Sequence, residues 1–324
     1  MMMQHLTASV GLCTYNGEQF LRRQIDSILR QTHPVKEVVV IDDLSTDGTR
    51  QILEQYAGDH PGLFRLIFNT ENQGARKNFE QLLTLCKGDV VFFSDHDDIW
   101  LPHKVARMIR HFEEHPEDKV LFTDATIINE KDEQLPHSLL EVNRFTAETQ
   151  SYIKTKDDLL RYMLRHDKMV TGATLAISKE FIPALVPFKL MNKFWHDAWI
   201  GYAAVNAGVL NYIDEPLIQY RVHCNQQVGC GEKLAQLMQG VAPIPELMRN
   251  EMDRTCSEED LIKLVHIRRK RVRMFKRLSN FLQFNQQIID EIRRECYDAE
   301  RAFKAKPFPV RWKQSINIML NRPV

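Results

Sequence analysis

Ser94-Asp95-His96-Asp97-Asp98-Ile99-Trp100 decides how this sequence is interpreted, because it places three carboxylates within four residues. The preceding run, Asp89-Val90-Val91-Phe92-Phe93, is rich in β-branched and aromatic residues and predicts a short buried strand. The carboxylates therefore follow the carboxyl end of a strand, where ligands bind in open α/β sheets. Because close negative charges repel one another, this acidic septet predicts a site for a hard divalent cation.

An ordinary acidic turn is the alternative interpretation. Aspartate hydrogen-bonds to its own backbone in turns, and Pro102 suits the start of a helix soon afterwards. Taken alone, the septet is compatible with both interpretations, and its surroundings decide between them.

The composition is that of a globular protein with one large or two modest domains: 324 residues, 44% hydrophobic and 27% charged. No run of about 18 apolar residues predicts a membrane span, and the first five residues lack the features of a signal peptide. Six cysteines occur without Cys-x-x-Cys spacing, which indicates reduced thiols. We therefore expect a cytoplasmic protein.

Strand and helix patterns alternate along the first third of the chain, which predicts an α/β fold with a mostly parallel sheet. The predicted strands are 8–12, 37–41, 63–68, 89–93, 120–124, 173–178 and 209–213. Helices are predicted at 18–31, near 50–56, up to 86, at 101–114 and at 195–206. Residues 129–169 have a mixed pattern that predicts no topology.

Two further strand ends carry side chains suited to a nucleotide. Asp42 and Asp43 follow the run Val38-Val39-Val40-Ile41, and Tyr15 lies on the turn after the first strand. Asp43 could accept a hydrogen bond from a base N–H, and Tyr15 could stack on that base. Each could instead be an ordinary turn or loop residue. Together, in this order, they favour a nucleotide and metal site.

The chain resembles a family 2 glycosyltransferase with the nucleotide-sugar-binding GT-A fold, over roughly residues 6 to 228. The acidic septet, in the form Asp-x-Asp-Asp-Ile-Trp, most resembles the rhamnosyltransferase-like branch. The other motifs that carry the resemblance are Cys13-Thr14-Tyr15-Asn16-Gly17-Glu18, Gln31-Thr32, Glu37-Val38-Val39-Val40-Ile41-Asp42-Asp43, Ser45-Thr46-Asp47-Gly48-Thr49, Asn72-Gln73-Gly74, Gly172, His196-Asp197 and Tyr220-Arg221-Val222-His223.

The resemblance implies a Rossmann-like GT-A domain at residues 1–228, with a mainly helical, basic extension at 229–324. It also implies a nucleoside-diphosphate-sugar donor, a UDP- or dTDP-sugar, with dTDP-rhamnose as one candidate. Asp43 would contact the uracil or thymine ring, Tyr15 would pack on it, and Asp95 would lie near the ribose and the sugar.

The cofactor implied by the resemblance is Mg²⁺ or Mn²⁺. Asp97 would be its principal ligand, with Asp95 as a further candidate, and Asp98 would assist or only orient its neighbours. His223 could complete the metal shell or touch the diphosphate, although a structural histidine is the alternative. Arg221 could neutralise phosphate charge bidentately.

The mechanism implied is inverting, with Asp197 as the general base that takes the proton of the acceptor hydroxyl. The alternative for Asp197 is an acid in the first turn of a helix, where it meets the helix dipole favourably. His196 replaces a glutamate common at that position and is a candidate base partner or acceptor contact. Trp195, Trp199 and Trp100 bracket the expected acceptor side, although core packing suits at least two of them.

The expected acceptor is a glycan or lipid-linked glycan in surface polysaccharide or O-antigen biosynthesis. A sugar nucleotidyltransferase is one alternative, but it would need a glycine-rich basic loop, and residues 13–24 contain only Gly17. A non-catalytic scaffold that binds nucleotide sugars or glycans is another. The presence of both Asp97 and Asp197 argues against it.

The C-terminal part is basic: residues 231–324 contain 19 Lys and Arg against 12 Asp and Glu. Apolar residues between Leu261 and Leu282 recur at near-helical spacing among Lys and Arg. Such a helix could contact the inner face of the cell membrane peripherally, or pack on the catalytic domain. We expect no nucleic-acid partner, because no aromatic interleaving or binding motif accompanies these cations.

Overall fold

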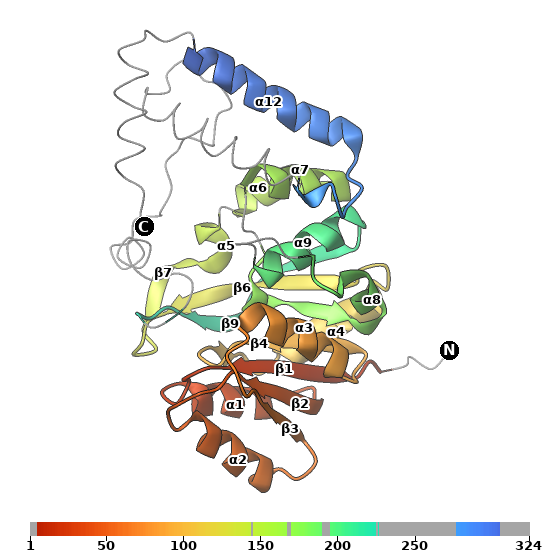
Figure 1. Cartoon of the computed structure of the whole chain (residues 1–324). Helices are drawn as coiled ribbons and strands as arrows, with labels where there is room; N and C mark the ends of the chain where they lie inside the picture. The colour runs from red at the N-terminus through yellow and green to blue at the C-terminus, as the bar shows by residue number, and fades with distance from the viewer. Residues whose placement is uncertain are drawn as a thin grey trace. The chain divides into compact units, whose positions relative to one another are not determined.

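The computed structural model describes residues 5–143, 145–166, 170–189, 195–224, 226 and 277–304 (Figure 1). The chain divides into two compact units, one of residues 1–157 with 168–243 and one of residues 158–167 with 244–324. The predicted domain boundary at 228 lies outside the described residues, so it stays a prediction. Most of the predicted basic helix, residues 261–276, lies outside them too.

The first unit is built on a nine-stranded sheet with the order β3-β2-β1-β4-β8-β6-β9-β5, and β7 pairs with β6. Pairing is parallel from β3 to β4 and between β6 and β9, and antiparallel where β8, β5 and β7 join. The strands are β1 Ala8–Thr14, β2 Val35–Asp42, β3 Phe64–Phe68, β4 Val90–Ser94, β5 Ile99–Trp100, β6 Val120–Ile128, β7 Gln134–Ser138, β8 Ala176–Ser178 and β9 Leu210–Arg221. The predicted α/β fold is confirmed, with a sheet that is parallel in its first half and mixed in its second.

Apolar residues bury the central strands. All of β1 and β4 are buried, as is β2 from Val38 to Asp42, and helices flank the sheet, which is the usual reason for uninterrupted apolar runs in parallel strands. The helices of this unit are α1 Leu21–Leu29, α2 Thr49–Asp59, α3 Ala75–Leu85, α4 Lys104–Glu114, α5 Leu139–Val142, α6 Ala147–Tyr152, α8 Ile182–Leu185 and α9 His196–Asn206. Two 3₁₀ turns, Gly172–Thr174 and Lys179–Phe181, complete it.

Three sequence predictions need correction in the second half of the sheet. The strand predicted from 173 begins at Ala176, because residues 172–174 form a 3₁₀ turn. The strand predicted to end at Ile213 continues to Arg221, because β9 pairs with β6 past a register shift at Asp124. The dipeptide Ile99–Trp100 forms a strand, β5, on the edge of β9.

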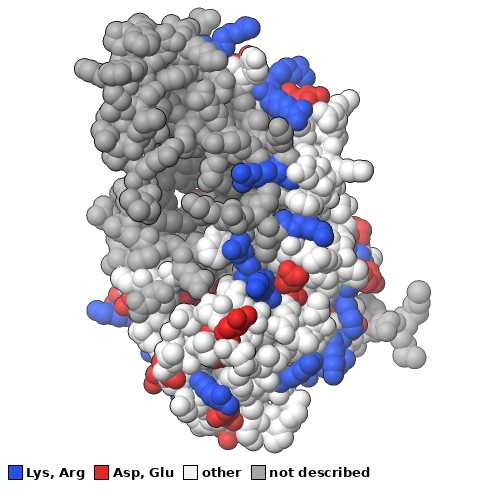
Figure 2. All heavy atoms as spheres, viewed as in Figure 1, with Lys and Arg blue, Asp and Glu red and all other residues white. Residues whose placement is uncertain are grey.

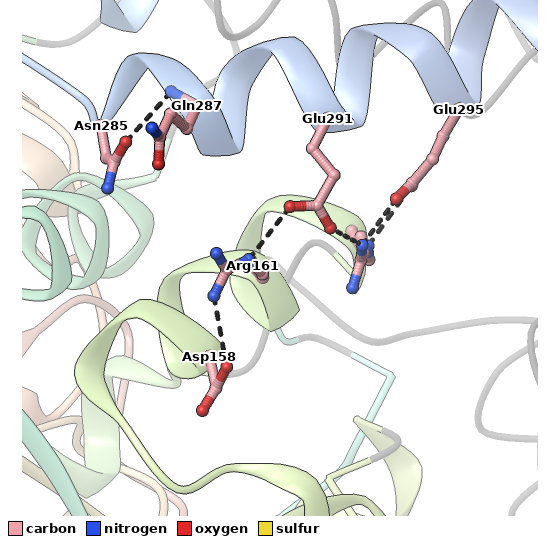
Figure 3. Close-up of polar contacts among 7 residues, drawn as sticks. Asp158, Arg161, Asn285, Gln287, Glu291 and Glu295 are labelled. Carbon is pink, nitrogen blue, oxygen red and sulfur yellow. Dashed lines mark hydrogen bonds and ion pairs between the residues drawn. The ribbon is translucent and has the colours of Figure 1, made fainter.

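The described part of the second unit consists chiefly of α7, Lys156–His166, which begins two residues before this unit, and α12, Gln286–Lys304. Ion pairs join the two helices, with Arg161 Nε 3.2 Å from Glu291 and Arg165 Nη2 2.6 Å from both Glu291 and Glu295 (Figure 3). Helix α12 agrees with the predicted helical extension.

On the face seen in Figure 2, the Lys and Arg side chains of the described residues are scattered among uncharged ones, with Asp and Glu between them. None of the helices in the described part of the chain is both long enough and apolar enough to cross a membrane.

Candidate active site

Three neighbouring parallel strands bring the predicted site residues to one edge of the sheet. Strand β1 lies between β2 and β4, with Thr14 opposite Asp42 and Leu12 opposite Ser94. The residues that follow these strands, among them Tyr15, Asp43 and Asp95, therefore share the carboxyl edge, where α/β sheets bind ligands.

The acidic loop, defined here as residues 95–98, connects β4 to β5 and is held at both ends by helix α1. Gln24 Nε2 donates to Ser94 Oγ over 2.7 Å, and the amide of Trp100 donates to Ser27 Oγ over 2.9 Å. All four of these side chains are buried. The loop thus begins and ends at fixed points, which limits the positions open to its carboxylates.

Asp97 and His223 form a buried pair in which Nε2 lies 2.9 Å from Oδ2. Burial raises the pKa of Asp97, but the charge of His96 and the hydrogen bond from His223 outweigh it, so the pKa lies below its ordinary value. Two cis ligands at about 2.1 Å from an octahedral cation lie about 3 Å apart. The spacing of this pair therefore fits two ligands of one Mg²⁺ or Mn²⁺.

The third predicted metal ligand, Asp95, does not join this pair in a ready-made site. Within the described ranges, no group of three or more His, Cys, Asp or Glu side chains is arranged to hold a metal ion. A cation bound by Asp97 and His223 would thus take its other ligands from a substrate or from water, as Mg²⁺ commonly does.

Asp95 and Asp98 lie in an environment that disfavours their ionised forms. Burial, followed by the charges of Asp97 and Asp197, raises the pKa of Asp95 to about 7. Burial and the charges of Asp97 and Asp95 raise the pKa of Asp98 well above its ordinary value. Asp98 Oδ1 accepts from the amide of Arg221, and its Oδ2 has no partner in the described part of the chain. The surroundings of the loop therefore do not stabilise all three carboxylates in their ionised forms at once.

Lys104 is a cation of this site that the sequence analysis missed. It is fully buried at the start of α4, where Nζ donates to the carbonyl of Ala173 over 2.9 Å and lies 4.2 Å from the centre of the Trp100 ring. Burial lowers the pKa of Lys104 to about 7, although Asp98 and Asp95 act in the opposite direction. The available signal was its position: Lys104 precedes Met108 and Phe112 at four-residue steps on the buried face of α4.

Arg221 is completely buried at the end of β9. Its Nε donates to the carbonyl of Asp97 over 2.6 Å, and Nη1 donates to the carbonyl of Asn129 over 2.8 Å and lies 2.5 Å from Asp132 Oδ1. Nη2 is buried and has no hydrogen-bond partner among the described residues, so two of the three guanidinium nitrogens are bonded within the protein and the bidentate contact with phosphate stays a prediction.

Asp43, on the expected base side, is well supplied with hydrogen-bond donors. Its Oδ1 accepts from Asn69 Nδ2 and the amide of Gln73, and its Oδ2 accepts from the amide of Gly74, each over 2.8 Å. Burial raises its pKa, but these hydrogen bonds outweigh burial and hold the pKa below its ordinary value. An ionised carboxylate has about four acceptor positions, so capacity for a base N–H remains.

Tyr15 lies on a tightly held turn whose main chain is bonded to the segment that carries Asp43. The amide of Asp43 donates to the carbonyl of Thr14 over 2.9 Å, and the amide of the next turn residue, Asn16, donates to Ser45 Oγ over 2.8 Å. Tyr15 is 40% exposed, so part of its side chain is accessible to a ligand. Stacking on a base remains a prediction for this residue.

Asp197 lies in the first turn of α9, and its Oδ1 accepts from the amide of Ala198 over 2.7 Å. Its charge contributes to the raised pKa of Asp95, which relates it to the acidic loop. His196 is buried against the rings of Phe79 and Phe93, and burial together with the charge of Arg76 lowers its pKa to about 3. Both ring nitrogens of His196 are without partners in the described part of the chain. Burial thus favours the uncharged form of His196, and its role as base partner or acceptor contact stays a prediction.

The three tryptophans near this site differ in burial. Trp100 and Trp199 are each 2% exposed and belong to the core, as expected for at least two of the three. Trp195 is partly exposed immediately before α9 and remains the candidate for an acceptor contact.

Comparison with known sequences identifies the family. The model of Glycosyl transferase family 2 matches residues 9–181, more than half of the chain. An uncharacterized glycosyltransferase of Nostoc sp. is 30% identical over 219 residues, which is 66% of this chain and 64% of that protein. The dTDP-rhamnosyl transferase RfbG of Shigella flexneri is 27% identical over 67% of this chain and 73% of its own length. The chain thus spans less than two thirds of the Nostoc relative.

Solved structures show the same fold. TarS of S. aureus, solved with UDP-GlcNAc, has a TM-score of 0.57 at 19% identity over 92% of this chain and 73% of its own. The mannosyltransferase PcManGT of Pyrobaculum calidifontis, solved with GDP-Man and Mn²⁺, has a TM-score of 0.53 at 18% identity over 98% and 81%. The fold expected from the resemblance is confirmed, whereas the rhamnosyltransferase-like branch stays a prediction. The chain belongs to glycosyltransferase family 2.

Proposed function

We propose that the protein transfers a sugar from a nucleoside diphosphate to an acceptor hydroxyl with the help of a divalent cation. The observation that carries this proposal is the buried Asp97–His223 pair, spaced as two ligands of one cation at the carboxyl edge of the sheet. Asp43 and Tyr15 follow neighbouring strands at the same edge. The family and the nucleotide sugars bound by TarS and PcManGT support the same activity.

Donor binding is divided between two sides of this edge. Asp43 accepts a hydrogen bond from the uracil or thymine N–H while the exposed ring of Tyr15 packs on the base. Asp95 lies near the ribose and the sugar, where its high pKa suits a carboxyl that donates a hydrogen bond to a sugar oxygen.

Asp97 and His223 would hold Mg²⁺ or Mn²⁺. The cation would supply positive charge to the diphosphate leaving group as the glycosidic bond breaks. Asp98 accepts from the amide of Arg221 and so orients the loop that carries Asp97. PcManGT was solved with Mn²⁺, which favours a divalent ion in a fold of this kind.

Asp197 acts as the general base. It takes the proton of the acceptor hydroxyl as the oxygen attacks the anomeric carbon, so the sugar is transferred in a single displacement with inversion. The electrostatic effect of Asp197 on Asp95 supports a position near the donor. Trp195 offers a partly exposed aromatic face for an acceptor sugar.

The donor and acceptor follow from the resemblance and from one relative. A dTDP-sugar such as dTDP-rhamnose is our first candidate, supported by the similarity to a dTDP-rhamnosyl transferase. The acceptor would be a glycan or lipid-linked glycan of a surface polysaccharide such as O-antigen. In that role the enzyme would work in the cytoplasm, with peripheral contact to the inner face of the membrane through its basic C-terminal part.

The activity is tested by incubating the protein with Mn²⁺, an acceptor glycan extract and a panel of UDP-, dTDP- and GDP-sugars. Release of nucleoside diphosphate with one donor supports the proposal. Pyrophosphate formed from a nucleoside triphosphate and a sugar phosphate would instead indicate a nucleotidyltransferase. Nucleotide-sugar binding without turnover across the panel would indicate a binding scaffold.

The base is tested by Asp197→Asn. We expect kcat to fall by about a hundredfold or more, because general base catalysis contributes at least that much. The affinity for Mn²⁺ should not change, since Asp197 is not assigned to the cation. Transfer at the parent rate would remove Asp197 from this role.

A further inference from the structure

We propose that Arg221, Asp132 and Arg23 form a clamp that positions the two metal-binding segments against each other. The clamp is a feature of the metal-free protein, but its benefit to cation binding rests on the proposed function. It assigns a positioning role to an arginine that the sequence analysis expected on the phosphates.

The inner half of the clamp joins the acidic loop to the end of β9. Arg221 donates from its amide to Asp98 Oδ1 over 2.9 Å and from Nε to the carbonyl of Asp97 over 2.6 Å. His223 follows two residues after Arg221 on the same segment. One residue thus fixes the main chain that carries Asp97 relative to the segment that carries His223, and with it the 2.9 Å gap between them.

The outer half joins Arg221 to the turn between β6 and β7. Nη1 donates to the carbonyl of Asn129 over 2.8 Å and lies 2.5 Å from Asp132 Oδ1. Asp132 has a positive φ of 66°, which aspartate tolerates better than most residues. Its other oxygen, Oδ2, accepts from Arg23 Nη1 over 2.7 Å. The carboxylate therefore ties the buried guanidinium to a surface guanidinium on α1.

The ring of Phe20 completes the packing around this arginine. Its centre lies 4.4 Å from Arg221 Cζ and 5.1 Å from the ring centre of His223. Phe20 thus contacts both a clamp residue and a proposed metal ligand. A buried arginine is stable only when paired, and its planar fork can serve several acceptors at fixed angles, which a lysine cannot do. Preorganisation of this kind is the usual function of residues that hold metal ligands.

Three substitutions remove successively more of the contacts in the clamp. Arg23→Ala removes only the outer contact, Asp132→Asn removes the charge that pairs Arg221, and Arg221→Lys removes the fork itself. Lys131→Ala is the matched control, because it removes an exposed charge from the same turn without touching the clamp. Asp132 and Arg23 are partly exposed, so their variants test the proposal even if Arg221→Lys fails to fold.

Two measurements are made on each folded variant. The affinity of the metal-free protein for Mn²⁺ is followed by electron paramagnetic resonance of the free ion, without nucleotide. We expect a loss of about ten- to a hundredfold in Arg221→Lys, a smaller loss in Asp132→Asn, the smallest in Arg23→Ala and none in the control. Hydrogen exchange in peptides covering residues 94–100 of the metal-free protein should become faster in the same order.

Unchanged exchange and unchanged Mn²⁺ affinity in the folded variants would overturn the clamp. The two proposals fail in different ways. If the parent protein binds Mn²⁺ neither alone nor together with a nucleoside diphosphate, the metal site is wrong, and the exchange data alone then decide whether Arg221 holds the loop. If the parent binds Mn²⁺ and exchange does not respond to Asp132→Asn or Arg221→Lys, the clamp is wrong and the metal site stands.

Discussion

Asp43 and the acidic loop lie at the same edge of one sheet, yet their surroundings shift the pKa values of Asp43 on the one hand, and of Asp95 and Asp98 on the other, in opposite directions. Asp43 receives three hydrogen bonds of 2.8 Å and has a pKa below its ordinary value. Asp95 and Asp98 have raised pKa values, and Asp98 Oδ2 has no partner among the described residues. The first environment stabilises the ionised carboxylate, and the second disfavours it.

The difference in pKa indicates different roles: Asp43 anchors the neighbouring loop, and the acidic loop is the candidate cation site. Asp43 already has the partners that fix the loop around Gln73 and Gly74, so a ligand adds to a finished arrangement. In the acidic loop, His96 and His223 compensate Asp97, whereas Lys104 and the amide of Arg221 do not offset the burial of Asp98, and a cation would add positive charge there. Stability should therefore depend more on Asp43 than on the acidic loop, and metal binding should depend on the acidic loop.

Asp97→Asn should have the largest effect on activity. We expect kcat/KM to fall by at least about a thousandfold, because charge stabilisation by a metal is worth several kcal/mol. In the parent, Mn²⁺ at 100 times its dissociation constant should add about 2.7 kcal/mol to the free energy of unfolding. This increment should disappear in the variant, as measured by thermal melts with and without Mn²⁺.

Asp59→Asn is the control for this substitution, since it changes an exposed carboxyl at the end of α2. It should retain both activity and the Mn²⁺ increment. An Asp97→Asn variant that keeps the increment would place the cation elsewhere.

Asp43→Asn should have the largest effect on stability. An amide offers one acceptor oxygen in place of two and turns an N–H₂ toward backbone donors. We expect the free energy of unfolding to fall by about 1–3 kcal/mol, the usual cost of leaving buried donors unsatisfied. Urea denaturation with and without Mn²⁺ measures this loss, which should be the same in both. A loss found only with Mn²⁺ would contradict the assignment of Asp43 as an anchor.

The contribution of Asp43 should also depend on pH. Because its pKa in the folded chain lies below the unfolded value of about 3.9, its stabilisation is present above that value. The contribution is lost as pH falls through the lower folded pKa. The difference in stability between the parent and Asp43→Asn should therefore shrink as the pH falls below about 4 in urea titrations. A difference that grows on acidification would reverse the direction of the pKa shift.

The sequence predicted the half of the fold in which strands are continuous apolar runs. Val38 to Ile41 is the clearest case, and the carboxylates after it and after β4 fell at the expected edge. The predicted strand 209–213 ends eight residues before β9 does, because Asp214, Glu215 and Pro216 have the composition of a turn. Only its pairing with β6, past a register shift, carries the strand through them.

The candidate site was predictable in residue identity but not in role. Motifs indicated that Arg221 and the acidic loop belong together, yet which carbonyls surround a guanidinium is decided by tertiary packing. Lys104 is the opposite case. The four-residue spacing of Lys104, Met108 and Phe112 predicts that Lys104 lies on the buried face of α4, but the sequence analysis did not include it among the site residues. Sequence patterns place residues on elements, and burial then decides which charges reach a ligand.

Leu44→Gly should have the smallest effect on the free energy of unfolding, and it tests whether Asp43 anchors this turn. Leu44 directly follows Asp43, has a positive φ of 67° and is 46% exposed. Glycine removes the strain but loses more backbone entropy on folding, so we expect a net gain of about 0.5 kcal/mol in the free energy of unfolding.

The gain from Leu44→Gly should be smaller in an Asp43→Asn background, where the anchor that imposes this conformation is weakened. A double-mutant cycle by urea denaturation measures the coupling. An equal gain in both backgrounds would show that Asp43 does not hold this turn.

The most direct test of the central claim is the anomalous diffraction signal of Mn²⁺ in crystals grown with a nucleoside diphosphate. Our account predicts one peak within about 2.0–2.3 Å of both Asp97 Oδ2 and His223 Nε2, with diphosphate oxygens completing the shell. A peak away from this pair, or a nucleotide bound at Asp43 and Tyr15 while Asp97 and His223 remain hydrogen-bonded to each other without metal, would contradict it.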